Sequence, residues 1–238
     1  MTAPRIDVCP DHSAQFVQTI APEPDAVQEE MATEAESRGY RFPGEGSFPT
    51  VGPTVGAWLY QLASRPDVER VFEFGSGFGY SAYWIARALP ERGKLVLTER
   101  DEDELALARE FMERGQFPAT IQYEQGDALS IFEETTRTFD LVLLDHENDA
   151  YPAALERVRG RLSPGGVIVA DNVMTAAIIQ TEQLLAGLQK GAIDDVNAHT
   201  MGVYEYLQTV RSDPAFRTQL VPIGGGLAVS HYEPAAEG

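Results

Sequence analysis

Oxygen-bearing side chains follow two apolar runs in the second half of the chain, at the point where each run ends. Asp145 follows FDLVLL at 139–144, and Asp171 and Asn172 follow GVIVA at 166–170. Ligands of open α/β sheets bind beyond the carboxyl ends of the strands, and neighbouring strands lie roughly 5 Å apart. If these two strands are neighbours, the three side chains converge. Two carboxylates and an amide oxygen suit a hard cation such as Mg²⁺, although acids at strand ends also cap turns.

A glycine-rich turn follows another apolar run, RVFEF at 70–74. The turn reads GSGFGYS over 75–81 and precedes a helical pattern, so its glycines let a ligand approach the amino end of that helix. A dinucleotide fingerprint, G-x-G-x-x-G, needs glycine where Tyr80 stands. That departure, with Glu73 just before the turn, argues against NAD and for S-adenosylmethionine. The alternative is a tight strand-to-helix turn that binds nothing.

Acidic residues after the next two strands complete a candidate nucleotide site. Glu99 ends the second strand, and a carboxylate there is placed to bind both hydroxyls of a ribose. It does not separate NAD from S-adenosylmethionine, because both contain that ribose, and a plain surface acid is the alternative. After the third strand, Asp127 and Ala128 stand where an adenine could be held, which by itself is a weak signal.

Five short apolar runs alternate with helical patterns from residue 70 onward. The runs cover 70–74, 94–98, 120–125, 139–144 and 166–170, and the helical patterns lie near 80–89, 101–114, 151–161, 175–189 and 202–212. This alternation predicts successive βαβ units. Two final runs joined by Gly224–Gly226 predict an antiparallel hairpin. We therefore expect an α/β fold, a doubly wound, Rossmann-like, seven-stranded sheet.

Residues 1–50 differ in composition from the rest of the chain. They are rich in Pro, Glu and Ala, with helix-like stretches at 15–20 and 24–37, and they end in a segment dense in Gly and Pro. We expect an N-terminal helical extension over 1–50 and one larger domain over 51–238. The extension has no clear role within the core, so it could mediate formation of a homodimer.

The charge balance is strongly acidic. There are 37 Asp and Glu against 18 Lys and Arg, and since Lys94 and Lys190 are the only lysines, arginine supplies 18 − 2 = 16. Such a surface repels polyanions, which disfavours nucleic acid and anionic lipid as partners. It indicates adaptation to high salt, where screening removes self-repulsion, although a merely acidic protein is the alternative.

Several other features of the composition exclude whole classes of protein. No run approaches 18 consecutive apolar residues, so we expect no membrane span. The first residues lack an apolar signal core, so we expect a cytoplasmic protein. Cys9 is the only cysteine, which excludes an intramolecular disulfide and a cysteine-based zinc site.

Taken in order, the motifs FEFGSGFGYSA, LLDHENDAY and GGVIVADNV resemble the metal-dependent, catechol O-methyltransferase-like family of class I S-adenosylmethionine-dependent methyltransferases. The resemblance covers roughly residues 48–175, and the terminal PIGGGLAVSHY resembles that family's closing hairpin. It implies a metal bound by Asp145, Asp171 and Asn172. The cofactor contacts that it implies come from Val51, Glu73, Gly75, Ser76, Gly77, Ser81, Glu99, Asp127, Ala128 and His146.

One departure from the family concerns the proton acceptor. Three residues after the metal-binding Asp145 the family carries a lysine that acts as general base, and here that position is Asn148. An amide does not take up a proton usefully at neutral pH. Either the metal alone acidifies the substrate hydroxyl, or a group such as His146 or Glu147 accepts the proton. The candidate catalytic set is therefore Asp145, His146 and Asn148.

The resemblance implies an enzyme that moves a methyl group from S-adenosylmethionine to a hydroxyl of a small catechol-like or phenolic acceptor, with Mg²⁺ or another divalent cation. A first alternative is methylation of a hydroxylated uridine in tRNA, which the net charge of −19 disfavours. A second is a nicotinamide-dependent oxidoreductase of Rossmann type, disfavoured by Tyr80 and by the Asp171–Asn172 pair. A cofactor-binding protein without activity is the third.

Overall fold

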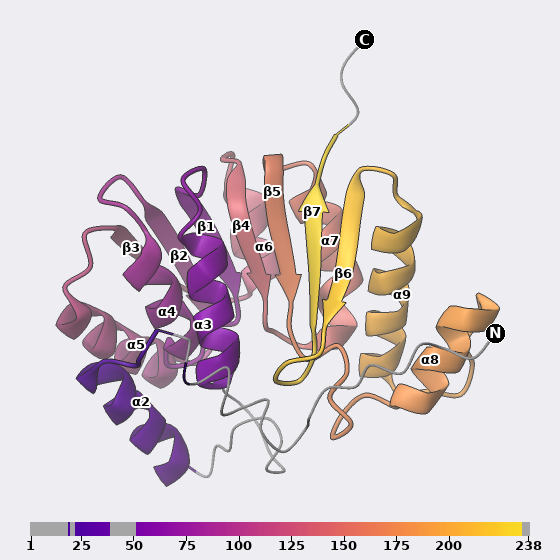
Figure 1. Ribbon diagram of the computed structural model, residues 1–238, viewed down its shortest axis with the longest axis horizontal. Helices are drawn as coiled ribbons and strands as arrows, with labels where there is room; N and C mark the ends of the chain where they lie inside the picture. The colour runs from indigo at the N-terminus through magenta and orange to yellow at the C-terminus, as the bar shows by residue number, and fades with distance from the viewer. Residues whose placement is uncertain (1–18, 20–21, 39–50, 235–238) are drawn as a thin grey trace.

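The computed structural model describes residues 19, 22–38 and 51–234, and within them one sheet of seven strands forms the centre of the molecule (Figure 1). The order across the sheet is β3-β2-β1-β4-β5-β7-β6. Neighbours from β3 to β5 are parallel, whereas β7 runs antiparallel to both β5 and β6. The strands are β1 (Arg70–Phe74), β2 (Lys94–Glu99), β3 (Thr120–Gln125), β4 (Phe139–Leu144), β5 (Leu162–Ala170), β6 (Phe216–Val221) and β7 (Leu227–Tyr232).

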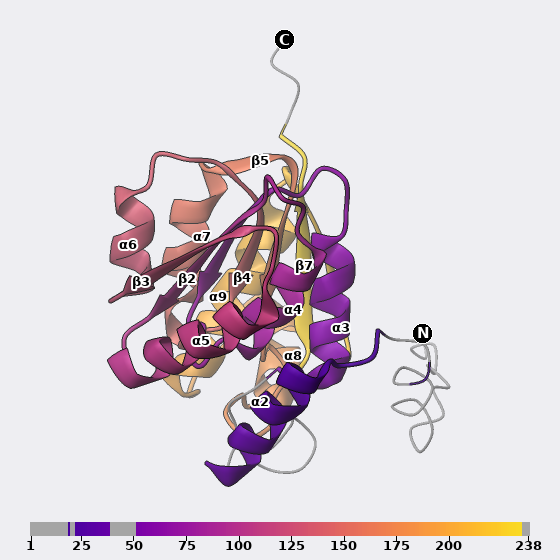
Figure 2. The same cartoon turned by 90° about the vertical axis from the view of Figure 1, so that its left-hand side faces the viewer.

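Helices cover both faces of the sheet, which Figure 2 shows from the side. One face carries α2 (Ala26–Ser37), α3 (Gly52–Ala63), α4 (Tyr80–Ala88) and α5 (Glu102–Gly115). The other carries α6 (Ala128–Glu134), α7 (Tyr151–Arg159), α8 (Thr181–Lys190) and α9 (Ala198–Ser212), with the short 3₁₀ helix η1 (Asn148–Ala150) before α7.

Successive strand residues feed two apolar clusters, one on each face. In β1, Val71 packs with the helices of the first face, and Phe72 and Phe74 pack with those of the second. All six residues of β4 are buried. This burial explains why the central strands read as continuous apolar runs in the sequence, since neither face meets water.

The predicted fold class, five parallel strands and the final hairpin are confirmed. Two helices, α3 and α6, were not expected. Helix α3 begins inside the Gly/Pro-dense segment with Pro53 in its first turn, where a missing N–H costs nothing. Helix α6 has only seven residues and begins after Asp127, whose carboxylate accepts a hydrogen bond from the Ser130 amide at 2.9 Å.

The boundaries of two expected helices also differ. Helix α8 begins at Thr181, whereas a start near 175 was expected, because residues 173–180 form turns between β5 and the helix. Helix α9 begins at Ala198, four residues earlier than expected, because the Asn197 side chain accepts the Thr200 amide at 2.8 Å and caps the helix.

The described N-terminal helix packs on the sheet's first helical layer. Met31 and Ala35 of α2 are buried in the same cluster as α3 and α4. The expected helix at 15–20 lies outside the described residues apart from position 19, and the predicted domain boundary at residue 50 stays a prediction. Among the described helices, none is both long and apolar enough to cross a membrane.

Candidate functional site

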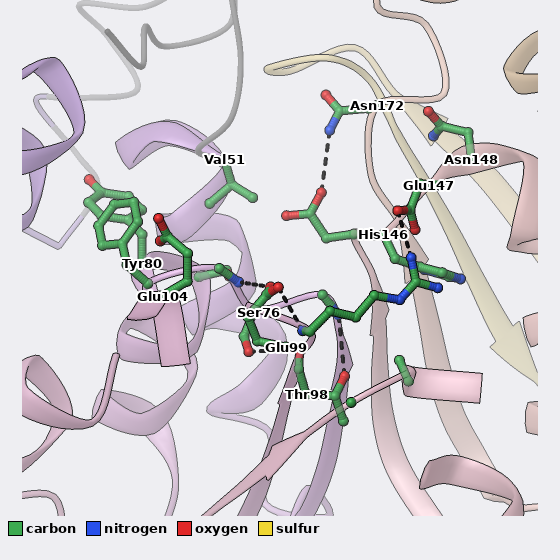
Figure 3. Close-up of a pocket in the computed structure, with 18 of the residues that line it drawn as sticks. Val51, Ser76, Tyr80, Thr98, Glu99, Glu104, His146, Glu147, Asn148 and Asn172 are labelled. Carbon is green, nitrogen blue, oxygen red and sulfur yellow. Dashed lines mark hydrogen bonds and ion pairs between the residues drawn. The ribbon is translucent and has the colours of Figure 1, made fainter. Parts of the chain in front are cut away.

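A cavity of about 390 Å³ lies at the carboxyl ends of the parallel strands, at the lower edge of the sheet in Figure 1. Figure 3 shows Val51, Tyr80 and Glu104 on one side of it and His146, Glu147 and Asn148 on the other. The lining residues are Val51, Gly75, Ser76, Gly77, Phe78, Tyr80, Ser81, Thr98, Glu99, Arg100, Glu104, Gly126, Ala128, Asp145, His146, Glu147, Asn148, Asn172, Ile178 and His199.

The glycine turn presents its backbone to this cavity. Gly75 has φ +80°, and a Cβ placed there would stand 2.8 Å from the carbonyl oxygen of Asp145. A side chain at this position would therefore meet the backbone of the neighbouring strand end, so glycine is required for close approach as well as conformation. The Ser76 amide and hydroxyl both donate to the Thr98 carbonyl, at 2.9 and 3.0 Å, which ties the turn to β2.

Glu73 lies beneath the turn and is fully buried. The Ser81 hydroxyl donates to its Oε1, while its Oε2 has no hydrogen-bond partner among the described residues. Burial raises the pKa of Glu73 to about 8, against the hydrogen bond from Ser81, and the nearby Glu99 charge adds to the rise. A buried acid with a free oxygen is suited to receive a cationic group.

Glu99 ends β2 and faces the glycine turn (Figure 3). Its Oε2 accepts the Gly77 amide at 2.9 Å, and its Oε1 accepts the amides of Arg100 and Asp101 at 2.7 and 3.0 Å. These bonds fix the carboxylate in the cavity wall. Its remaining lone pairs can accept hydrogen bonds from a vicinal diol, which agrees with the predicted ribose contact.

Arg100 joins two strand ends across the cavity. Its guanidinium pairs with Asp127 after β3 at 2.6 Å and with Glu147 after β4 at 2.9 Å. The hydrogen bond from Arg100 lowers the pKa of Asp127 to about 2. The Asp127 side chain is thus engaged with Arg100 and with the start of α6, and only its neighbours Gly126 and Ala128 line the cavity.

The three predicted metal ligands stand together at the ends of β4 and β5, which are paired strands. Asn172 Nδ2 lies 3.4 Å from Asp145 Oδ1, and the Asn172 amide donates to Asp171 Oδ1 at 2.7 Å. Burial raises the pKa of both carboxyls, and the Asp171 charge raises that of Asp145 further. Among the described residues, no cationic side chain forms an ion pair with Asp145 or Asp171. A bound cation would balance the two carboxylates.

The terminal hairpin supports Asn172 from behind. The Thr175 hydroxyl lies 3.1 Å from Asn172 Oδ1 and 3.1 Å from the Gly225 carbonyl, and the Val173 amide donates to Gly226. Asn172 has φ +58°, a left-handed conformation that asparagine tolerates better than most residues. Its amide nitrogen faces Asp145, so metal ligation by the oxygen needs the amide group turned over. Among the described residues, no three His, Cys, Asp or Glu side chains are grouped to hold a metal.

His146 packs between the rings of Phe74 and Tyr151, with ring centroids 5.3 and 5.4 Å away. Both ring nitrogens are buried and have no hydrogen-bond partner among the described residues. Burial lowers the pKa of His146 to about 4, so the ring is neutral at pH 7 and takes up a proton weakly. Asn148 is 3% exposed, and its Nδ2 lies 3.5 Å from the Asp171 carbonyl.

The structure thus brings most predicted residues to one cavity. Glu73, Asp127 and Asp171 are not among its lining residues: the first and last lie behind the wall, and Asp127 points to Arg100. The sequence did not single out the lining residues Phe78, Thr98, Arg100, Glu104, Ile178 and His199. Thr98 and Arg100 flank Glu99 at a strand end, which is a usable signal, whereas Ile178 and His199 come from loops and a helix start with no such signal.

The comparisons with known proteins all match O-methyltransferases. A sequence model of the O-methyltransferase family matches residues 29–232. A catechol O-methyltransferase of Niastella koreensis is 30% identical over 173 residues, covering 66% of this chain and 78% of the relative. A caffeoyl-CoA O-methyltransferase of Arabidopsis thaliana is 24% identical over 187 residues, covering 76% of this chain and 70% of the relative. The crystal structure of a Bacillus cereus O-methyltransferase with SAH superposes with a TM-score of 0.76 at 21% identity, covering 92% of this chain and 96% of that one.

Proposed function

The chain belongs to the O-methyltransferase family, and from this premise we propose that it transfers the methyl group of S-adenosylmethionine to a hydroxyl of a small catechol-like or phenolic acceptor, assisted by Mg²⁺. The observation that carries the proposal is the meeting of two groups in one cavity. Asp145 and Asn172 lie at one end, with Asp171 directly behind them, and the glycine turn with Glu99 lies at the other.

The methyl donor fits the end of the cavity that the glycine turn forms. Glu99 would bind the ribose hydroxyls, and the amino end of α4, which follows the turn, would favour the carboxylate of the methionine part. Buried Glu73, with Oε2 free and Ser81 on Oε1, would balance the ammonium group from below. Val51, 4% exposed, would close the cavity from α3.

The metal fits the donor set of the other end. Asp145, Asp171 and, with its amide turned over, Asn172 would hold a hard cation, which when bound lowers the pKa of an acceptor hydroxyl. A bound cation would also remove the repulsion that raises the pKa of the two carboxyls. Tyr151 donates its hydroxyl to the carbonyls of Leu144 and Asp171, 2.9 Å from each, and so holds the two strand ends in register.

This arrangement performs the reaction mainly by positioning. The acceptor oxygen, once deprotonated, attacks the methyl carbon as the bond from that carbon to sulfur breaks, and the walls of the cavity hold the two in line. The Asn148 amide does not take up a proton at neutral pH, so this residue does not serve as the base. Its position in the cavity wall lets it orient groups near the metal site. The nicotinamide alternative is set aside because the matching family transfers methyl groups to oxygen.

Methyl transfer from labelled S-adenosylmethionine to a panel of catechols, phenols and hydroxylated tRNA tests the proposal. We expect transfer to catechols that needs Mg²⁺ and stops with a chelator. Asp171→Asn should lose most of the Mg²⁺-dependent rate and still bind S-adenosylhomocysteine, because Asp171 lies behind the cavity wall. Asp149→Asn, exposed in η1, is the matched control and should be unaffected.

Two results would contradict the proposal. Full activity of Asp171→Asn in the presence of chelator would overturn the metal assignment. Transfer to tRNA alone would move the function to the nucleic-acid acceptor that the acidic surface disfavours.

A further inference from the structure

His199 is a histidine in the cavity wall that the proposed reaction has not yet used. It lies in the first turn of α9 and lines the cavity with Ile178, Asn148 and Asn172, near the end that holds the acidic pair. Its Nδ1 is buried and has no hydrogen-bond partner among the described residues. A buried polar atom without a hydrogen-bond partner is unusual in a folded protein, so its place in the cavity wall calls for a functional reason.

Hydrogen bonds hold this part of the wall rigid. The Gln180 amide donates to Thr200 Oγ1 at 2.9 Å, and Gln180 Oε1 accepts the Asn197 amide at 2.6 Å. Asn197 Nδ2 donates to the Ile178 carbonyl at 2.9 Å. These hydrogen bonds join the loop before α8 to the start of α9, the two segments that contribute Ile178 and His199 to the cavity wall.

Close packing of α9 on η1 puts His199 in the wall of the same cavity as Asn148, which stands where the family carries a lysine. A Cβ at Gly202 would stand 2.3 Å from the carbonyl oxygen of Asn148 and 2.5 Å from Cα of Asp149. Only glycine lets the helix approach η1 this closely. Residues three apart lie on one side of a helix, so His199 is on the side of α9 that meets Asn148.

Other nitrogen bases at the cavity are less available. Among the described residues that line it, His146 is packed between two aromatic rings, and Arg100, paired with Asp127 and Glu147, keeps its guanidinium protonated and cannot act as a base. Lys94 begins β2 and Lys190 ends α8, and neither lines the cavity. His199 is the remaining imidazole among the described residues that line the cavity.

We propose that His199 is the general base of this enzyme, which takes the proton of the acceptor hydroxyl in place of a lysine; the inference rests on the proposed function. The hydroxyl proton moves to a ring nitrogen of the His199 imidazole. The oxygen's electron pair forms the new C–O bond while the C–S bond of the sulfonium breaks, leaving a methyl ether and a thioether. The imidazolium then returns its proton to water, so charge and atoms balance.

The test uses His199→Ala, His199→Gln and the control His231→Ala, an exposed histidine on β7 away from the cavity. With an acceptor that the wild-type enzyme methylates, kcat of both His199 variants should fall about 100-fold, the lower end of what a general base contributes. Added imidazole should restore part of the kcat of His199→Ala. Affinity for S-adenosylhomocysteine should stay within about twofold of wild type, which also shows that the variants fold.

Each other outcome is decisive. If kcat of the His199 variants stays within a few-fold of wild type, or if imidazole restores nothing, His199 is not the base while the proposed function stands. If His199→Ala fails to bind S-adenosylhomocysteine, the size-retaining His199→Gln decides by its kcat. If the wild-type enzyme methylates no catechol or phenol, the proposed function fails and the inference falls with it.

Discussion

Replacing Glu73 by Gln should stabilise the ligand-free protein and lower its affinity for the methyl donor. Glu73 is fully buried, one carboxyl oxygen has no partner among the described residues, and burial raises its pKa from 4.5 to about 8. The folded state therefore keeps a proton that the unfolded chain releases as pH rises above 4.5. Stability due to this group is complete below pH 4.5 and is lost as pH rises toward 8.

The size of the effect follows from the two pKa values. A difference of about 3.5 units, from 4.5 to about 8, corresponds to roughly 4–5 kcal/mol at 1.36 kcal/mol per unit. Gln keeps the shape of the side chain and the hydrogen bond from Ser81 without this pH dependence. The free energy of unfolding of Glu73→Gln should thus match wild type near pH 4.5 and exceed it by up to that amount above pH 8.

Denaturant unfolding from pH 4.5 to 9 in the presence of chelator measures this difference, and calorimetry with S-adenosylhomocysteine measures the binding. Subtracting the two unfolding curves removes the contribution of Asp171, which both proteins share, and leaves of Asp145 only the part that comes from the Glu73 charge. Glu91→Gln, exposed in the turn before β2, is the matched control and should follow wild type at every pH. A difference between Glu73→Gln and wild type that stays flat with pH, or binding as tight as wild type, would refute the reasoning.

Two further predictions concern the turn and the charge. Gly75→Ala should destabilise the protein by roughly 1–3 kcal/mol and weaken binding of S-adenosylhomocysteine, because φ is +80° and the new Cβ would meet the Asp145 carbonyl. The control Gly160→Ala, whose Cβ would have nothing within 4 Å, should change neither stability nor binding. Equal melting temperatures of the two variants would contradict this prediction. Raising NaCl from about 0.1 to 1 M shortens the screening length from about 10 to 3 Å. The chain, with its net charge of −19, should therefore gain on the order of 1 kcal/mol of stability, or roughly 2–4 °C in Tm. A Tm that is constant or falls would show that the acid excess is not an adaptation to salt.

Sequence reasoning succeeded where a local pattern carries the information. The runs at 70–74 and 139–144 match β1 and β4 because strands covered on both faces read as nearly continuous apolar runs. The run at 120–125 matches β3, a partly exposed strand at the edge of the sheet. The glycine turn was recognised because a backbone that bends at φ +80° beside another strand excludes side chains. Helix α3 was missed because glycine and proline usually mark loops, and nothing local shows that Pro53 falls in a helix's first turn.

The chain order of motifs by itself determined the fold class, the family and the strand ends that carry Glu99, Asp145, Asp171 and Asn172. Side-chain period and turn chemistry are local, so they can be read along the chain. Only the tertiary structure decided which of these groups meet and in what state. Burial turned Glu73 into an acid with a raised pKa, and packing of Gly202 of α9 on η1 brought His199 into the wall of the cavity that Asn148 also lines. Distance and desolvation depend on the whole fold, and no local pattern contains them.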